Sequence, residues 1–92
     1  MDNKIRCLKL PDAQQGGLLV LITVDSIISM EVPKESTLVD PNTGEVYEID
    51  VNKHTLIYEK SYKKSGNYEY YSPLSLKEMI MLINSNAVYP VE

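Results

Sequence analysis

Short apolar runs, separated by proline, glycine or polar residues, make up the first part of the chain. Residues 5–10 form one such segment, which Pro11 should end because proline removes a donor from a strand ladder. Residues 18–24 are a nearly continuous run of leucine, isoleucine and valine, which is typical of a strand covered on both faces. We therefore expect two strands here, the second of them in the centre of a sheet.

Alternation of apolar and polar residues predicts two further strands. After a bend or bulge at Asp25-Ser26, the alternation runs over residues 28–32 until Pro33 stops it. It returns over residues 46–51, where Tyr47 begins the apolar side. Each segment should therefore have one face on the core and one in water.

Turn residues mark the hairpins of the remaining chain. Asp40-Pro41-Asn42-Thr43-Gly44 is a strong turn signal, because proline presets one turn dihedral and glycine accepts a positive one. Residues 55–60 and 68–72 read as two more strands, joined by a loop with Gly66 at its tip.

One helix is predicted near the C-terminal end, over residues 76–84. Ser75 and Glu78 form a capping box, in which each side chain satisfies a backbone N–H that the first turn leaves free. Leu74 and Met79 have the spacing of a hydrophobic staple. The stripe expected to lie on the sheet is Leu76, Met79, Ile80 and Ile83.

The order of these elements predicts an α+β fold. We expect a mostly antiparallel β-meander of five to six short strands, as a twisted sheet or a partly rolled barrel, with one C-terminal helix. A chain of 92 residues is too short for two cores, so residues 1–92 should form a single domain. Residues 85–92 are a candidate C-terminal arm.

Charge and cysteine content bear on the class of protein. The net charge of −4 argues against a surface coated in phosphate-binding cations, although a local basic patch is compatible with it. The lone Cys7 cannot form an intramolecular disulfide, which fits a reducing cytoplasm. The N-terminus lacks the features of a secretory signal, and no apolar stretch approaches the roughly 20 residues that cross a bilayer. We therefore expect a cytoplasmic protein without a membrane partner.

Residues that commonly carry catalysis are sparse. The only histidine, His54, stands at a predicted strand start, and no second histidine or cysteine cluster completes a zinc site. A nucleophile–base pair of Cys7 and His54 is conceivable, but nothing in the sequence brings the two together. Gly16-Gly17 precedes a strand, whereas a phosphate-binding loop opens a helix, so it reads as a turn. The sequence predicts no enzyme, no cofactor and no metal.

Aromatic and basic side chains are interleaved on the hairpin predicted over residues 53–71. Single-stranded nucleic acid is bound by such mixtures, because bases stack on rings while ammonium groups track the phosphates. Tyrosines also stabilise hairpins by cross-strand pairing alone, and Arg6 is the only arginine available for base or phosphate recognition. The residues of this candidate site are Tyr58, Lys60, Lys63, Lys64, Tyr68 and Tyr70.

A second candidate surface is apolar. Two apolar residues of the predicted helix fall outside its stripe, and much of the tail over residues 87–91 is apolar as well. An exposed apolar patch on so small a protein usually marks a partner site, and self-association is the simplest case. Alternatively, the tail folds back over its own helix. The candidate partner-binding residues are Met81, Leu82, Val88 and Tyr89.

Two motifs of the chain have counterparts in a known family. They are Thr23-Val24-Asp25-Ser26-Ile27, running on to Met30-Glu31-Val32-Pro33, and Ser75-Leu76-Lys77-Glu78-Met79-Ile80 with Ile83. Both resemble the small flagellar-operon FlbD-like family, which has an asparagine where this chain has Thr23 and a tighter second hairpin. The resemblance implies a strand-rich fold with a final helix and a role in regulating motility.

Two hypotheses about function follow from the sequence. The first is a small non-enzymatic interaction or regulatory module that forms a homo-oligomer through its C-terminal helix and tail. The second is a single-stranded nucleic-acid-binding protein that uses the tyrosine- and lysine-rich hairpin. A mass above 10.4 kDa in solution supports the first, and salt-sensitive binding of an oligonucleotide supports the second.

Overall fold

The computed structural model describes residues 6–61 and 65–85. Over these residues the chain forms antiparallel strands followed by one α-helix, which is the predicted α+β fold. The elements are β1 (Cys7–Asp12), η1 (Ala13–Gln15), β2 (Leu18–Thr23), η2 (Val24–Ser26), β3 (Ile27–Glu31), β4 (Thr37–Val39), β5 (Val46–Glu48), η3 (Val51–Lys53), β6 (Thr55–Lys60), β7 (Asn67–Ser72) and α1 (Leu76–Asn84).

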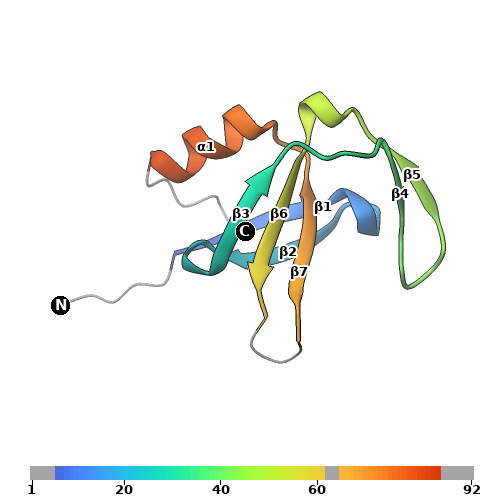
Figure 1. Cartoon of the computed structure of the whole chain (residues 1–92), viewed down its shortest axis with the longest axis horizontal. Coiled ribbons are helices and arrows are strands. Elements are labelled where there is room, and N and C mark those ends of the chain that lie inside the picture. The colour runs from blue at the N-terminus through green and yellow to red at the C-terminus, as the bar shows by residue number, and fades with distance from the viewer. Residues whose placement is uncertain (1–5, 62–64, 86–92) are drawn as a thin grey trace.

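The strands are divided among three small antiparallel sheets. β1 pairs with β2, β4 pairs with β5, and the third sheet has the order β3-β6-β7. Figure 1 shows β4 and β5 standing apart from the other strands as an arm. Because this hairpin leaves the sheet, β3 pairs with β6. The described strands number seven, where a meander of five to six was expected.

The core lies where the β1–β2 ribbon, the three-stranded sheet and α1 meet. In Figure 1 the β1–β2 ribbon crosses the strands of the three-stranded sheet, and α1 lies along one end. The side chains that these three layers bury together are Leu8, Leu10, Ile22, Ile57 and Met79. Burial of each of these side chains contributes about 1.5–3 kcal/mol to the free energy of unfolding.

The expectation that residues 18–24 form a central strand is wrong. β2 is an edge strand whose one strand neighbour in the described chain is β1. Only Ile22 is fully buried, while Leu18, Leu19 and Leu21 are at least half exposed. The ribbon has two strands and one covered face, so Leu19 and Leu21 alternate with the more buried Val20 and Ile22 and point to solvent, although the run is continuous in apolar residues.

Pro11 does not end the first strand, because β1 continues to Asp12. The N–H of Val24 donates to the carbonyl of Arg6 at 2.9 Å, so the even-numbered residues of β1 turn their backbone groups toward β2. The nitrogen of Pro11 therefore points away from β2, and the ladder loses no donor.

A β-bulge changes which face of β3 is buried. The register with β6 shifts between Ile27 and Ser29. Ile27 and Met30 pack against the core, while Ile28 and Val32, which were expected on the buried face, are exposed. A bulge was expected near Asp25-Ser26, and the observed one lies just after that position.

The helix begins and ends where its local sequence predicts. Ser75 Oγ accepts from the N–H of Glu78 at 3.2 Å, and Glu78 Oε1 accepts from the N–H of Ser75 at 2.8 Å. The bond from the Ser75 backbone lowers the pKa of Glu78. The predicted stripe is partly wrong, because α1 is rotated so that Leu82 packs against the core and Ile80 is 44% exposed.

Candidate functional site

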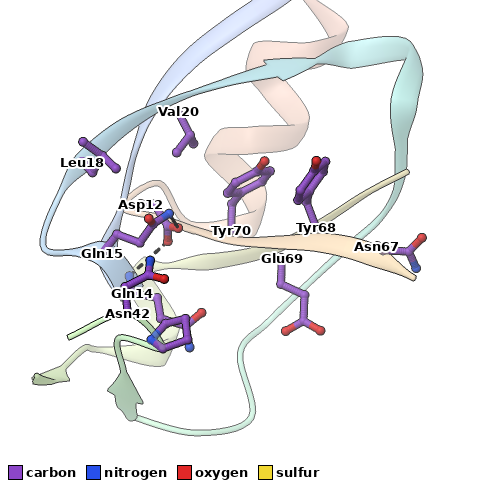
Figure 2. A pocket seen from close by; sticks show the side chains of 11 residues that line it. Asp12, Gln14, Gln15, Leu18, Val20, Asn42, Asn67, Tyr68, Glu69 and Tyr70 are labelled. Atoms are coloured by element: carbon purple, nitrogen blue, oxygen red, sulfur yellow. Dashed lines mark hydrogen bonds between the residues drawn. The ribbon is translucent and has the colours of Figure 1, made fainter. Parts of the chain in front are cut away.

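A groove of about 580 Å³ follows the free edge of β7, with walls from β2, η1 and the turn between β4 and β5 (Figure 2). All four residues over 67–70 line it, although consecutive strand residues point to opposite faces. The groove therefore wraps around the strand edge. We call it the β7-edge groove; its lining is Asp12, Gln14, Gln15, Leu18, Val20, Pro41, Asn42, Asn67, Tyr68, Glu69 and Tyr70.

The two walls of the β7-edge groove differ in chemistry. In Figure 2, Tyr68 and Tyr70 stand on the side of β7 that faces Leu18 and Val20 of β2. Glu69 points to the opposite side of β7, where the groove is lined by polar side chains such as Asn42. One wall is therefore aromatic and aliphatic, and the other is polar with a carboxylate.

The backbone of β7 is partly open toward the groove. The N–H of Tyr71 donates to Asp12 Oδ1 at 3.0 Å, so Tyr71 turns its backbone away from β6. Since this direction alternates along an antiparallel strand, Asn67 and Glu69 also turn their N–H and C=O groups outward. Within the described chain, no strand pairs with β7 on that side.

Asp12 closes one end of the β7-edge groove. Its side chain is 1% exposed, and its carboxylate accepts three hydrogen bonds. Oδ1 accepts from the N–H groups of Gln14 and Tyr71, and Oδ2 accepts from Gln15 Nε2 at 2.8 Å. Asp12 thus caps η1 and occupies the place of a strand partner opposite Tyr71. The sequence analysis missed this residue, although an aspartate at the start of a turn commonly accepts a hydrogen bond from the backbone N–H two residues ahead.

The tyrosines of the groove form a near-parallel pair. The ring centroids of Tyr68 and Tyr70 are 6.1 Å apart and their planes differ by 26°. Burial, and next the negative charge of Glu59, raises the pKa of Tyr70 to about 12. The Tyr70 hydroxyl therefore stays protonated across the physiological range and can donate a hydrogen bond.

The charged side chains among the lining residues of the groove are carboxylates. Glu59 is 7% exposed and lies on the same face as the tyrosines, directly across the strands from Tyr68. Its Oε2 accepts from the N–H of Thr23 at 2.8 Å, which ties β6 to β2. Asp12 and Glu69 add two more carboxylates, and no described lysine or arginine lines the groove. Such a site attracts cations and repels phosphates.

The register divides the tyrosine- and lysine-rich hairpin between two faces. Tyr58 and Lys60 are two residues apart on β6 and therefore share one face of the sheet, and Tyr58 lies opposite Glu69 on that face. Tyr68 and Tyr70 lie on the other face. The structure thus does not bring the four described residues of the predicted nucleic-acid site together. Lys63 and Lys64 lie outside the described residues, and the nucleic-acid hypothesis stays a prediction.

The exposed side of α1 presents the second candidate surface. Met81 is 61% exposed and borders a shallow, mainly apolar hollow of about 380 Å³. The hollow is lined by Leu74, Glu78, Met81, Leu82 and Ser85, and we call it the helix hollow. Leu82 lines the hollow but also packs against the core, so only part of the Leu82 side chain is open to a partner. Val88 and Tyr89 lie outside the described residues.

The candidate catalytic residues have local structural roles. His54 Nδ1 lies 2.9 Å from the carbonyl oxygen of Asp50, within its own loop. Cys7 is half-buried in β1 and pairs with Thr23. Among residues 6–61 and 65–85, no three histidine, cysteine, aspartate or glutamate side chains gather closely enough to hold a metal ion. The absence of enzymatic activity stays a prediction.

Comparisons with known proteins place no further limit on the function. Neither a family model, nor a curated protein, nor a solved structure matches the chain. The resemblance to the FlbD-like family therefore stays a prediction. In the part of the chain that the structure describes, no helix has the length and apolar character required to cross a membrane.

Proposed function

We propose that this protein is a non-catalytic interaction module that self-associates through the exposed side of α1. The observation that carries the proposal is Met81, whose apolar side chain is 61% exposed beside the helix hollow. A surface helix normally carries polar residues on this side, yet Ile80 and Met81 stand together there. Contact with a partner would remove this apolar surface from water.

A second copy of the chain is the partner that this surface fits best. The charged residues of α1 are Lys77 and Glu78, which are opposite in charge, so two copies of the helix can meet without a net repulsion although Glu78 borders the helix hollow. A two-fold axis would place the same patch on both protomers. A helix of nine residues is about 13 Å long, so the contact should be small and its affinity modest.

Sedimentation equilibrium over a range of concentrations tests the proposal. The wild-type mass should rise above 10.4 kDa with concentration, and Met81→Lys should remain monomeric because a buried ammonium group lacks a partner. Leu82→Lys is a poorer test, since Leu82 also packs against the core.

Two matched variants locate the interface. Val46→Lys makes the same kind of change at an equally exposed position on β5 and should self-associate like the wild type. Leu21→Lys introduces the same charge on the exposed edge strand β2. A wild-type chain that stays monomeric at all concentrations contradicts self-association, and loss of association in Leu21→Lys alone contradicts the assignment to α1.

A further inference from the structure

We propose that the β7-edge groove binds an extended basic peptide, which pairs with β7 as an additional strand. This inference is independent of self-association through α1, because the groove and the helix hollow share no lining residue.

The backbone of β7 supplies the first part of the argument. Asn67 and Glu69 turn their N–H and C=O groups into the groove, so an incoming strand can continue the sheet. Asp12 already occupies the outward N–H of Tyr71. The carboxylate therefore fixes where the added strand must stop and leaves room for a short one, of about five residues.

The walls of the groove define the side chains of the partner. Successive residues of an added strand point alternately to the two faces of the sheet. Those on one face meet the rings of Tyr68 and Tyr70 and the aliphatic groups of β2, which suit apolar side chains. Those on the other face meet Glu69 and the amide of Asn42, which suit lysine or arginine.

Charge complementarity favours a basic peptide over other ligands. Asp12 and Glu69 line the groove, and Glu59 lies beside it opposite Tyr68. Lys60, opposite Asn67, is a described cation beside the groove, so three carboxylates against one ammonium group leave a net negative charge. An acidic peptide or a nucleic-acid strand would meet repulsion at the same place.

A titration followed by the amide NMR signals of the protein tests the inference. The probe is a capped peptide of alternating valine and lysine, about five residues long. Its binding should shift the signals of residues 67–70, and its affinity should fall as salt rises. The Met81→Lys variant should bind the peptide as the wild type does, so failure of the self-association proposal leaves this result unaffected.

Matched probes and variants separate strand pairing from simple charge attraction. The same peptide N-methylated at every residue keeps its charge but loses its backbone donors in either strand direction, and should bind at least about tenfold more weakly. Glu69→Lys should weaken binding of the unmodified peptide by a similar factor, whereas Glu48→Lys, an exposed glutamate on β5, should have little effect.

Four results would overturn the inference. They are no binding of the valine–lysine peptide at low salt, equal binding of the N-methylated peptide, equal binding of a valine–glutamate peptide, and shifts confined to signals away from the groove. An oligothymidylate that displaces the peptide would favour the nucleic-acid hypothesis instead.

Discussion

Asp12 and Asp50 make the same local contact in different surroundings. Each caps a 3-10 turn by accepting the N–H two residues ahead, at 3.0 Å in Asp12 and 2.9 Å in Asp50. Asp50 is exposed, and its side chain accepts from the N–H of Asn52 within the turn. Asp12 is buried and also bonds Tyr71 of β7, so the same side chain joins two layers of the fold.

The exchange Asp12→Ala should therefore cost more stability than Asp50→Ala. Loss of Asp12 leaves the part-buried N–H of Tyr71 without its acceptor, and we expect the free energy of unfolding to fall by about 2–4 kcal/mol. Asp50→Ala removes only an exposed cap, at a cost of about 1 kcal/mol. Urea unfolding followed by circular dichroism measures both, and equal losses would show that the contact with β7 adds nothing.

The raised pKa of Tyr70 has a consequence for alkaline stability. In the unfolded chain this hydroxyl should ionise near pH 10, whereas in the folded chain it ionises near 12. Between these values the unfolded state binds fewer protons, so stability is fully present below about pH 10 and falls as the pH rises toward 12. Tyr70→Phe should lose less stability over this interval in alkaline unfolding experiments, and an unchanged slope would contradict the assignment to Tyr70.

Among the elements, the β4–β5 arm is the least supported. Each of its strands has three residues, and among the described residues the two strands pair only with each other. Contacts with η1 attach the arm, through the bond from Gln14 Nε2 to the Val39 carbonyl and the buried side chain of Leu38. Gly16 has a φ of +68°, which favours glycine, and a Cβ there would lie 2.8 Å from the Tyr47 hydroxyl. The arm forms a wall of the β7-edge groove, so its order matters for the site.

Hydrogen exchange should divide the strands accordingly. A two-stranded hairpin with little buried surface opens locally at low cost, so the amides of β4 and β5 should exchange much faster than those of β6. β6 has a strand on each side and contains the fully buried Ile57. Amide exchange measured by NMR checks this order, and equal protection of β5 and β6 would show that the arm unfolds only with the whole domain.

At the scale of the whole molecule, polar contacts connect layers that the strand ladders leave separate. The guanidinium of Arg6 donates to the carbonyls of Leu82 and Ile83 at 2.8 and 2.7 Å, which satisfies the C-terminal end of α1 from the other end of the chain. Glu59 and Asp12 make the corresponding links from the β1–β2 ribbon to β6 and β7. The only arginine is thus engaged in a contact within the fold.

This arrangement also separates the two proposed binding surfaces. The β7-edge groove is built from strands and turns, and the helix hollow from α1 and the residue before its cap. A dimer formed through α1 would leave the β7-edge groove of each protomer accessible. The dimer would then have two peptide sites, and a partner with two basic segments would bind it more tightly than a partner with one.

The sequence by itself determined the features that depend on neighbouring residues. The bounds of α1 follow from the capping box of Ser75 and Glu78, and the turn at Asp40-Pro41-Asn42-Thr43-Gly44 follows from proline, glycine and the Asp40 side chain. Alternation also predicted the half-buried side of Tyr47. These contacts span at most a few residues, so local chemistry is sufficient to specify them.

The tertiary structure alone decided which faces are covered and where the grooves lie. The same leucine-rich run could be a central or an edge strand, and only the absence of a second neighbour in the described fold makes β2 an edge. Likewise, the rotation that buries Leu82, the contact of Asp12 with Tyr71 and the surroundings of Tyr70 join residues far apart in the chain. A pattern of apolar and polar positions gives the period of a strand or helix, but not the partner that each face will meet.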